Sequence, residues 1–359
     1  MHTQLVEKTT GIAVVGAGRW GNHLVRNFLN HPNAGLLAVV DLHGNRLQSL
    51  GQRYQLASTQ LVDANQWDTL LNREDIEAVA IATPASTHYE LIKSALRHGK
   101  HVFVEKPITV DAKDAIELCE LAHAMNRQLI VDHTYLFNAA VDAGQQWIKQ
   151  RKLGPLRYGY ATRTHLGPIR QDVDALWDLA IHDISIFSHW LQEFPCHVQA
   201  NGKIWLQPIR KNHHANICNP MLFPRGLSDQ VWVTLRYPSG IEVCIHLCWA
   251  NPDKQRRLCL VGDQGTLIFD ELHPQPLRAQ PGLLQRDHYS FTPQTSEPIS
   301  IPIEASEPLY SACDHFLKCV NNNQPSHISS GRLGAKFVET LQAITESLNQ
   351  GGTPVFLNA

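Results

Sequence analysis

Short apolar runs alternate with amphipathic segments through the first third of the chain. The runs are rich in Val, Ile and Ala, which is typical of strands buried on both faces of a parallel sheet, and the segments between them repeat their apolar residues at helical spacing. The runs are Ile12–Val15, Leu36–Val40, Ala78–Ala82, His101–Val104 and Leu129–Val131, and the clearest helical segments are Thr87–Arg97 and Asp111–Met125. This alternation predicts a doubly wound α/β domain with a parallel sheet in residues 1–134.

The pattern changes after about Tyr135. A helix is predicted near Ala139–Lys149, and the strands that follow are joined by short turns such as Pro238-Ser239-Gly240, which indicates antiparallel hairpins. These strands are Arg157–Thr164, Gln230–Tyr237, Ile241–Cys248, Arg257–Gly262 and Thr266–Asp270. A final amphipathic segment predicts a helix at Leu333–Leu348. Residues 135–359 are therefore expected to form a second α/β domain.

Two stretches of the second domain look irregular. Residues 207–228 are rich in Pro, Asn and His, and residues 272–302 are rich in proline, so both are predicted to be loops or irregular edges. The first stretch contains His213-His214 and Cys218, the nearest approach to a metal-ligand cluster in the sequence. Because this spacing matches no standard zinc pattern, no metal site is predicted.

The composition of the 359 residues is that of a globular protein, with 43% hydrophobic residues, 18% charged residues and a net charge of −2. This balance gives no reason to expect a nucleic acid or a membrane surface as a partner. No apolar run approaches the roughly 18 residues that a membrane span needs, and Met1–Thr10 lacks the apolar core of a secretion signal. The eight scattered cysteines form no C-x-x-C motif. We therefore expect a cytoplasmic protein with reduced thiols.

The first predicted strand leads directly into Gly16-Ala17-Gly18-Arg19-Trp20-Gly21, followed by a helical pattern. This is the G-x-G-x-x-G motif in the strand–turn–helix context that dinucleotide binding requires. Gly16 permits the tight turn, Gly18 lets backbone amides approach a pyrophosphate, and Gly21 lets the helix pack closely on the strand. Arg19 and Trp20 open the helix whose N-terminus attracts the phosphates, so they join the predicted cofactor site.

Asp41 lies 20 residues beyond Gly21, at the end of an apolar run. A carboxylate there accepts hydrogen bonds from the adenosine ribose hydroxyls and repels a 2′-phosphate. Leu42 and His43 follow, neither of which would bind that phosphate, so the sequence favours NAD over NADP. Arg46 keeps NADP open as the alternative.

Further polar residues follow the strands on the same expected sheet edge. Thr83-Pro84 closes one strand, His88 begins the next helical segment, and Glu105-Lys106-Pro107 closes another strand. We assign Thr83, Pro84, His88, Glu105 and Lys106 to the cofactor site because a dinucleotide crosses the carboxyl edge of such a sheet. An alcohol that loses hydride must also lose a proton, and Lys106 could stabilise the alkoxide or shuttle that proton. The alternative is a solvated surface lysine.

A second cluster occurs in Trp177–Asp183, where a helical pattern begins. Asp178 and His182 are four residues apart and are therefore expected on one helical face. A carboxylate beside an imidazole orients the ring and raises its basicity, which suits a general base that takes a hydroxyl proton. The alternative is structural, with Asp178 as the N-cap of the helix and His182 merely packed.

The ordered set of Gly16–Gly21, Asp41, Thr83-Pro84, Glu105-Lys106-Pro107 and Asp178-x-x-x-His182 resembles the glucose-fructose oxidoreductase/inositol dehydrogenase/rhizopine-catabolism (Gfo/Idh/MocA) family over nearly the whole chain. The resemblance implies a Rossmann domain followed by an α/β domain with a large, mainly antiparallel sheet, whose exposed face commonly makes a homo-oligomer, a dimer or tetramer. It also implies that Lys106 and His182 are the catalytic pair and that Asp178 is a partner of the substrate or of His182. Two positions depart from the family pattern: Ala180 replaces a common glycine, and Ser185 replaces a common acid.

The stretch Arg163–Asp172 is similar to the substrate loop of family members that act on nucleotide-linked sugars. Arg163 or Arg170 would then pair with a diphosphate, unless these arginines make structural ion pairs or face solvent. The function expected from the resemblance is NAD(P)-dependent interconversion of a secondary hydroxyl and a ketone on a sugar, with a UDP-N-acetylated sugar as the example. The alternatives are reduction of a dTDP- or UDP-keto-sugar, dehydrogenation of a free sugar or inositol, and a non-catalytic sensor of NAD or sugar.

Overall fold

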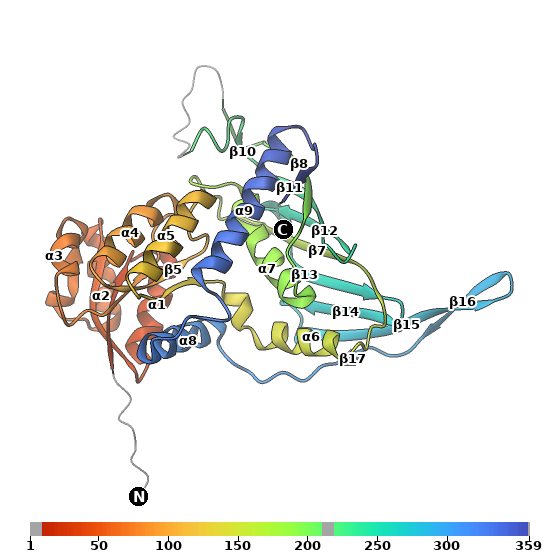
Figure 1. Cartoon of the computed structure of the whole chain (residues 1–359), viewed down its shortest axis with the longest axis horizontal. Helices are drawn as coiled ribbons and strands as arrows, with labels where there is room; N and C mark the ends of the chain where they lie inside the picture. Colours follow the sequence, from red (N-terminus) through yellow and green to blue (C-terminus); the bar gives the residue numbers. More distant parts are fainter. Residues whose placement is uncertain (1–8, 210–218, 358–359) are drawn as a thin grey trace, which may run out of the picture. The chain divides into compact units, whose positions relative to one another are not determined.

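The computed structural model describes residues 9–209 and 219–357 (Figure 1). Their contacts define two compact units. The first contains the described residues up to Phe137 together with Glu307–Val338, and the second contains those of Asn138–Ser306 together with those from Glu339 onward. His213, His214 and Cys218, the nearest approach to a metal-ligand cluster in the sequence, lie outside the described residues.

The first unit is built on a parallel sheet in the order β3-β2-β1-β4-β5-β6. Its strands are β1 (Thr10–Val15), β2 (Ala34–Asp41), β3 (Leu61–Asp63), β4 (Ala78–Ile81), β5 (His101–Glu105) and β6 (Leu129–Asp132). Its helices include α1 (Arg19–Asn30), α2 (Gly44–Tyr54), α3 (Trp67–Leu71), α4 (His88–Arg97), α5 (Ala112–Ala124) and short 3₁₀ turns at Ser58–Gln60, Ala64–Gln66, Ala85–Thr87 and Thr134–Phe137. The strand order reverses between β1 and β4, which is the point where such sheets bind dinucleotides. The predicted Rossmann architecture is confirmed.

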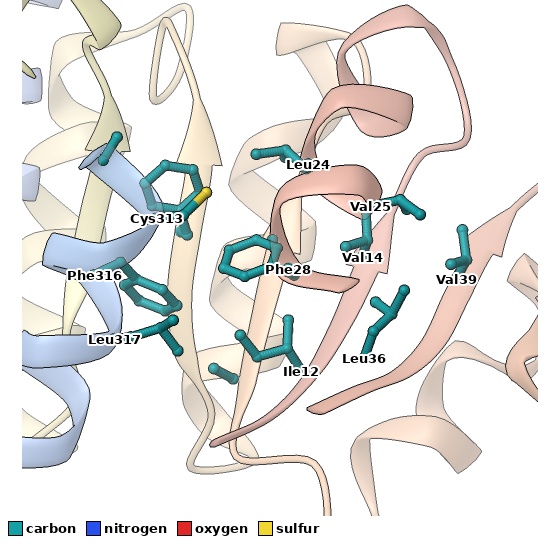
Figure 2. Close-up of a cluster of buried hydrophobic side chains, with 14 of the residues drawn as sticks. Ile12, Val14, Leu24, Val25, Phe28, Leu36, Val39, Cys313, Phe316 and Leu317 are labelled. Carbon is teal, nitrogen blue, oxygen red and sulfur yellow. The ribbon is translucent and has the colours of Figure 1, made fainter. Parts of the chain in front are cut away.

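A helix from late in the sequence completes the core of this unit. α8 (Pro308–Asn322) buries Cys313, Phe316 and Leu317 in one hydrophobic cluster with Ile12 and Phe28 (Figure 2). The ring centroids of Phe103 and Phe316 lie 5.4 Å apart. A fully buried phenylalanine contributes about 1.5–3 kcal/mol through the hydrophobic effect, so this packing ties α8 to the sheet. The sequence pattern predicts a single domain boundary after residue 134. Residues 307–338 nevertheless belong to the first unit, because the apolar face of α8 is buried in it.

The second unit contains one large sheet in the order β16-β15-β14-β13-β7-β12-β11-β8-β18, with β17 beside β15. The elements are α6 (Ala139–Lys149), β7 (Leu156–Leu166), a π-helical turn (Leu176–Ala180), α7 (Ile181–Leu191), β8 (His197–Lys203), β9 (Gln207–Pro208), β10 (Gly226–Leu227), β11 (Gln230–Arg236), β12 (Glu242–Cys248), β13 (Ala250–Gly262), β14 (Gly265–Asp270), β15 (Leu277–Asp287), β16 (Ser290–Thr295), β17 (Ile299–Ser300) and β18 (Val355–Phe356). α9 (Gly331–Asn349) contributes residues to both units. Only β7 and β12 pair in parallel among the described strands of this sheet. The expected mainly antiparallel sheet is confirmed.

Alternating burial gives the large sheet one face packed on helices. Along β11, Val231, Val233 and Leu235 are buried, while Trp232 is 55% exposed on the opposite face. Helices α6 and α7 are held together where Gly144 leaves room for Trp190, whose Nε1 donates to the carbonyl of Val141 at 2.9 Å. This packing positions α7, which carries the candidate histidine.

The expectation of an irregular segment at residues 272–302 was wrong. β15 and β16 form a long hairpin there, and β17 pairs with β15 at Arg278–Ala279. The prolines suggested irregular structure, but Pro293 lies on β16, the edge strand of the sheet. An edge strand has no further strand to bond on its outer side, so the N–H that proline lacks is not needed there. Among the described residues, no helix is both long and apolar enough to cross a membrane.

Candidate active site

The glycine loop has the geometry that its sequence predicts. Gly16 has a φ of 100°, and a Cβ added to it would lie 2.6 Å from the carbonyl oxygen of Ala82. A Cβ at Gly21 would lie 1.7 Å from the carbonyl oxygen of Gly16, so only glycine lets α1 pack this close. A Cβ at Gly18 would meet no atom within 4 Å, which leaves open space over the first turn of α1. No side chain caps this helix, so its first amides can face a phosphate.

Asp41 ties the glycine loop to the turn after β2. Its Oδ2 accepts a hydrogen bond from the backbone N–H of Ala17 at 2.7 Å, and its Oδ1 accepts one from His43 at 2.8 Å. Each carboxylate oxygen has further lone-pair capacity, so the group can still accept a ribose hydroxyl. The guanidinium of Arg46 lies 4.0 Å from Oδ2 and its side chain is 52% exposed. The carboxylate and a possible phosphate-binding arginine therefore stand at the same turn.

Arg19 and Trp20 lie between Gly18 and Gly21 of the glycine motif. Arg19 lines a cavity of about 220 Å³ between α1 and the end of α2. The other lining residues are Asn22, His23, Arg26, Arg53 and Tyr54. Trp20 is 43% exposed, and its ring packs edge-on against His23 at 5.6 Å. Their proposed contact with a cofactor stays a prediction.

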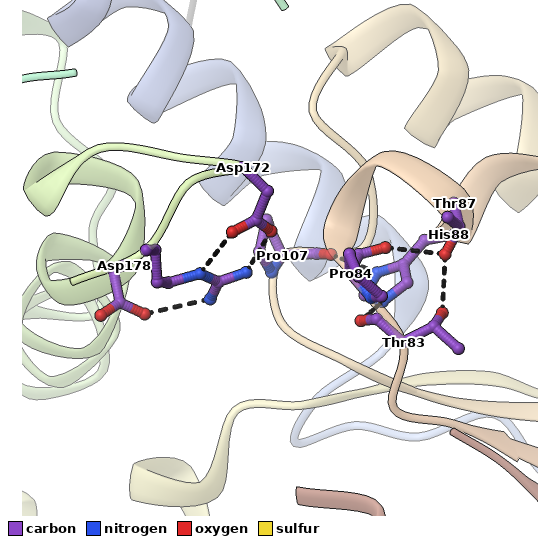
Figure 3. Close-up of polar contacts among 8 residues, drawn as sticks. Thr83, Pro84, Thr87, His88, Pro107, Asp172 and Asp178 are labelled. Carbon is purple, nitrogen blue, oxygen red and sulfur yellow. Dashed lines mark hydrogen bonds and ion pairs between the residues drawn. The ribbon is translucent and has the colours of Figure 1, made fainter. Parts of the chain in front are cut away.

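His88 links the turns that follow β4 and β5 (Figure 3). Its Nδ1 lies 2.8 Å from the carbonyl oxygen of Pro107, and its Nε2 lies 2.9 Å from that of Thr83. Thr83 Oγ1 contacts Thr87 Oγ1 at 2.7 Å, and Thr87 Oγ1 donates to the carbonyl of Pro84 at 2.8 Å. These bonds tie the carbonyl of Pro107, directly after Lys106, to the turn after β4. The structure thus gives His88 and Thr83 a positioning role in addition to the predicted cofactor contact.

Lys106 is only 8% exposed, so the alternative of a solvated surface lysine is wrong. It follows β5 directly, and Glu105, Asp132 and His133 lie buried at the ends of β5 and β6. Burial, with the charge of Asp132 next in importance, raises the pKa of Glu105 well above its usual range. Burial raises the pKa of Asp132 to about 6, and burial together with the charge of Lys106 lowers the pKa of His133 to about 3.

In the second unit, Asp178 lies within the π-helical turn that precedes α7. The interpretation of Asp178 as a helix cap is wrong, because the carboxylate of Asp174 accepts the N–H of Trp177 at 3.1 Å. Burial raises the pKa of Asp174 to about 7. π turns are frequent at functional sites, and this one replaces the regular i, i+4 spacing that the sequence assumed between Asp178 and His182.

Arg170 bonds to the carboxylates of Asp172, in the loop after β7, and of Asp178, in the π-helical turn; Figure 3 labels both acids. Its Nε donates to Asp172 Oδ1 at 2.8 Å, its NH2 donates to Asp172 Oδ2, and its NH1 donates to Asp178 Oδ1 at 3.1 Å. Burial raises the pKa of Asp172, but the hydrogen bond and charge of Arg170 outweigh this and lower it overall. Arg170 therefore holds Asp178, and its predicted contact with a diphosphate would require some of these bonds to be exchanged.

Arg163 makes the structural ion pair that was the alternative to substrate binding. Its Nε and NH2 both donate to Asp183 Oδ1, at 3.0 and 2.7 Å. Arg163 is 2% exposed and Asp183 is 0% exposed. The pair joins β7 to α7 and so supports the helix that carries His182, whose own carbonyl accepts a hydrogen bond from Ser185 Oγ at 2.7 Å.

Two family models match this chain. The model described as "Oxidoreductase family, NAD-binding Rossmann fold" matches residues 10–133, and the model described as "Oxidoreductase family, C-terminal alpha/beta domain" matches residues 170–357. The chain belongs to the Gfo/Idh/MocA family of oxidoreductases. The resemblance inferred from the motifs is thereby confirmed.

Curated relatives in the Gfo/Idh/MocA family carry several activities. The UDP-N-acetylglucosamine 3-dehydrogenase of Acidithiobacillus ferrooxidans is 28% identical over 55% of this chain and 59% of its own length. The scyllo-inositol 2-dehydrogenase (NAD(+)) of Bacillus subtilis is 23% identical over 89% of this chain and 88% of its own. The 2,7-anhydro-N-acetylneuraminate hydratase of Mediterraneibacter gnavus is 31% identical, but over only 44% of this chain and 40% of its own. The chain thus spans less than two thirds of two of these relatives.

Solved structures agree with the family fold. The crystal structure of an oxidoreductase from Magnetospirillum magnetotacticum has a TM-score of 0.74 and 27% identity, covering 94% of this chain and 100% of that one. That of the A. ferrooxidans UDP-N-acetylglucosamine 3-dehydrogenase has a TM-score of 0.74 at 19% identity, covering 95% of this chain and 98% of that one, which supports the fold alone.

Four polar residues near the family motifs were missed by the sequence analysis. Asp132 and His133 directly follow the last strand of the Rossmann sheet, a position at the carboxyl edge that could have singled them out. Asp174 carried no signal beyond its place before a helix. His165 is half-buried on β7; burial lowers its pKa, and the charge of Asp178 opposes this, so the two groups are electrostatic neighbours. Among the described residues, no three His, Cys, Asp or Glu side chains are arranged to hold a metal.

Proposed function

We propose that this protein is an NAD-dependent dehydrogenase that interconverts a secondary hydroxyl and a ketone on a sugar, with a nucleotide-linked sugar as substrate. The observation that carries the proposal is the buried Lys106, at the carboxyl end of β5 in a Rossmann unit of an oxidoreductase family. An ammonium at that edge of the sheet is where a hydroxyl undergoing oxidation would need a proton partner.

The residues around the glycine loop fit a dinucleotide. The open space over Gly18 and the uncapped amides of α1 suit a pyrophosphate, and Asp41 suits the adenosine ribose. A bound nicotinamide would supply the hydride chemistry. The chain itself holds the cofactor, excludes water and moves the proton.

The proton chemistry is assigned to two groups. His182 removes the hydroxyl proton, and Lys106 stabilises the developing alkoxide with its ammonium. The two roles can be exchanged, since an amine and an imidazole can each act as proton donor or acceptor. Asp178, held by Arg170, orients His182 or a substrate hydroxyl, because a carboxylate accepts hydrogen bonds from either.

The choice of NAD over NADP rests on Asp41, and Arg46 provides the control for testing it. A 2′-phosphate would meet the carboxylate of Asp41, which is itself held by two backbone N–H groups. Replacing Asp41 by Ala is expected to weaken NAD binding about tenfold and to narrow the preference over NADP, because it removes both a ribose partner and the repulsion. Arg46→Ala is the matched control and should weaken NADP more than NAD. Dissociation constants from intrinsic fluorescence decide this, and an unchanged ratio after Asp41→Ala contradicts the role.

The nucleotide-linked substrate is supported by the similarity to UDP-N-acetylglucosamine 3-dehydrogenase and by the loop that contains Arg170. The inositol dehydrogenase relative aligns over more of the chain, so free polyols are the matched comparison. The test follows absorbance of reduced nicotinamide with NAD and a panel of UDP-sugars, dTDP-sugars, free sugars and inositols. Turnover with sugar nucleotides supports the proposal; turnover with free polyols alone overturns its substrate, and NAD binding without any turnover overturns the enzymatic assignment.

The open face of the large sheet is the proposed contact between copies in a dimer or tetramer. It exposes Tyr158 and Trp232, and the Trp232 ring stacks on His246 with centroids 4.0 Å apart. Aromatic side chains of this kind are enriched at protein interfaces. Analytical ultracentrifugation of the protein and of Trp232→Arg tests this contact, and an unchanged mass for the variant would contradict it.

A further inference from the structure

Two acidic residues occupy paired positions at the ends of β5 and β6, and the first directly precedes the proposed catalytic lysine. Glu105 and Asp132 end β5 and β6 and are partners in the parallel register. They are 6% and 0% exposed. Thr134 Oγ1 donates to Asp132 Oδ1 at 2.9 Å, but among the described residues Glu105 Oε1 and Asp132 Oδ2 receive no hydrogen bond from an N–H or hydroxyl group. Two ionised carboxylates at such buried neighbouring positions repel each other strongly.

A single proton resolves this repulsion. Burial raises the pKa of both groups, and their mutual hydrogen bond raises that of Glu105 while it lowers that of Asp132. Glu105 is therefore the carboxyl that keeps the proton near neutral pH and donates it toward Asp132. The pair then carries one negative charge in place of two.

The surrounding titratable groups leave Lys106 as the positive partner of this charge. Lys106 lowers the pKa of both carboxyls. His133 has a pKa lowered to about 3 and is neutral, with Nδ1 at 2.7 Å from Ser329 Oγ. On α8, burial and the two carboxyls raise the pKa of the Cys313 thiol, so it is neutral as well. Electrostatic coupling is reciprocal, so a pair that is stabilised by the ammonium also stabilises the ammonium.

We propose that Glu105 and Asp132 share one proton and act together as a positioning pair, whose single negative charge keeps Lys106 protonated at the end of β5. The inference rests on the proposed function only for the role of Lys106 toward the substrate. During oxidation the pair opposes loss of the Lys106 proton, and it does so without itself touching the substrate.

The decisive measurement is the pH titration of the Lys106 side chain, followed by ¹³Cε NMR in the protein without cofactor and assigned with Lys106→Met. In Asp132→Asn, the amide can donate to Glu105, which then ionises, so one negative charge remains and the midpoint should move by less than about 0.5 pH unit. In the double variant Glu105→Gln/Asp132→Asn the charge is gone, and the midpoint should fall by at least about one unit. Cys313→Ala, a neutral neighbour, is the control. A double variant that folds and titrates like the wild type overturns the proposal.

Infrared spectroscopy gives a second test that needs no double variant. At pH 7 the wild type should show the band of a protonated carboxyl, and Glu105→Gln should lose part of that band because Glu105 carries the shared proton and Asp132 stays ionised. Undiminished intensity overturns the shared proton. Neither readout depends on turnover: if the midpoint shifts as expected but Lys106→Met remains active, the positioning pair stands and the proposed catalytic role of Lys106 fails.

Discussion

Lys106 and His182, the two residues assigned to proton transfer, are held by different structural devices. Lys106 follows a regular strand whose neighbours β4 and β6 are hydrogen-bonded in register, and His88 braces the turn through two backbone carbonyls. His182 is the second residue of α7, which follows a π turn, and its surroundings depend on two ion pairs, Arg163–Asp183 and Arg170–Asp178. The hydrogen bonds between paired strands hold a residue in place through many contacts, whereas an ion pair holds it through one side chain. The His182 side should therefore be the more sensitive to single substitutions away from the reacting groups.

The largest effect on turnover is expected from replacing Lys106 or His182 themselves, where both residues should be equally sensitive. Lys106→Met and His182→Ala should each reduce kcat about 10³-fold, because each removes a proton partner in the transition state. The dissociation constant for NAD should change little, since neither residue holds the pyrophosphate. Steady-state kinetics and fluorescence titration measure the two quantities, with Lys113→Met, an exposed lysine of the same unit, as the control. Turnover like the wild type in both variants would remove the catalytic assignment.

The next effect should separate the two sides. Arg163→Leu leaves Asp183 buried without its partner and should lower the free energy of unfolding of the second unit by about 3–5 kcal/mol. Arg163→Leu/Asp183→Leu should recover most of the loss, because the uncompensated charge is gone. Urea unfolding followed by tryptophan fluorescence measures both variants. A single variant as stable as the wild type would mean that the pair does not support α7.

Regularity also decides how much could be predicted from the sequence. The Rossmann strands and Gly16, Gly21 and Asp41 were predictable because each role follows from local backbone geometry at a strand end. α8 was missed because its place in the first unit depends on contacts with residues about 300 positions away, such as Ile12. The Glu105–Asp132 pair was missed for the same reason, because the pairing of two strands brings these residues together. The Arg170–Asp178 bond and the cap by Asp174 are contacts between residues close in sequence, and they were missed because a regular helix capped by Asp178 was assumed where the chain forms a π turn.

A smaller effect is expected at Arg170. Arg170→Lys keeps the positive charge but cannot reproduce two bonds to Asp172 and one to Asp178 in the same fixed geometry. Asp178 should then be less well oriented, and kcat should fall about threefold to tenfold with little change in NAD affinity. If Arg170 instead contacts a diphosphate, the KM for sugar nucleotides should rise while kcat is kept. Separate kcat and KM values with a sugar nucleotide distinguish positioning from binding, and wild-type values for both would contradict each role.

The smallest effect should appear as a pH dependence of stability at the π turn. The pKa of Asp174 is about 7 in the folded protein, raised by burial from an ordinary value of 3.8. The folded state therefore binds more protons at this site than the unfolded state between about pH 4 and pH 7, and stability from protonated Asp174 is fully present below that window and lost as pH rises through it. Asp174→Asn keeps an oxygen that can accept the N–H of Trp177 but cannot ionise, so its melting temperature should fall less than that of the wild type between pH 5 and pH 8. Glu105 and Asp132 contribute a slope of the same sign in both proteins, and only the difference between the two melting curves reports on Asp174. Parallel curves would mean that the buried carboxyl keeps its ordinary pKa, in which case the π turn is held by a permanent charge, as α7 is held by Asp183 and Arg163.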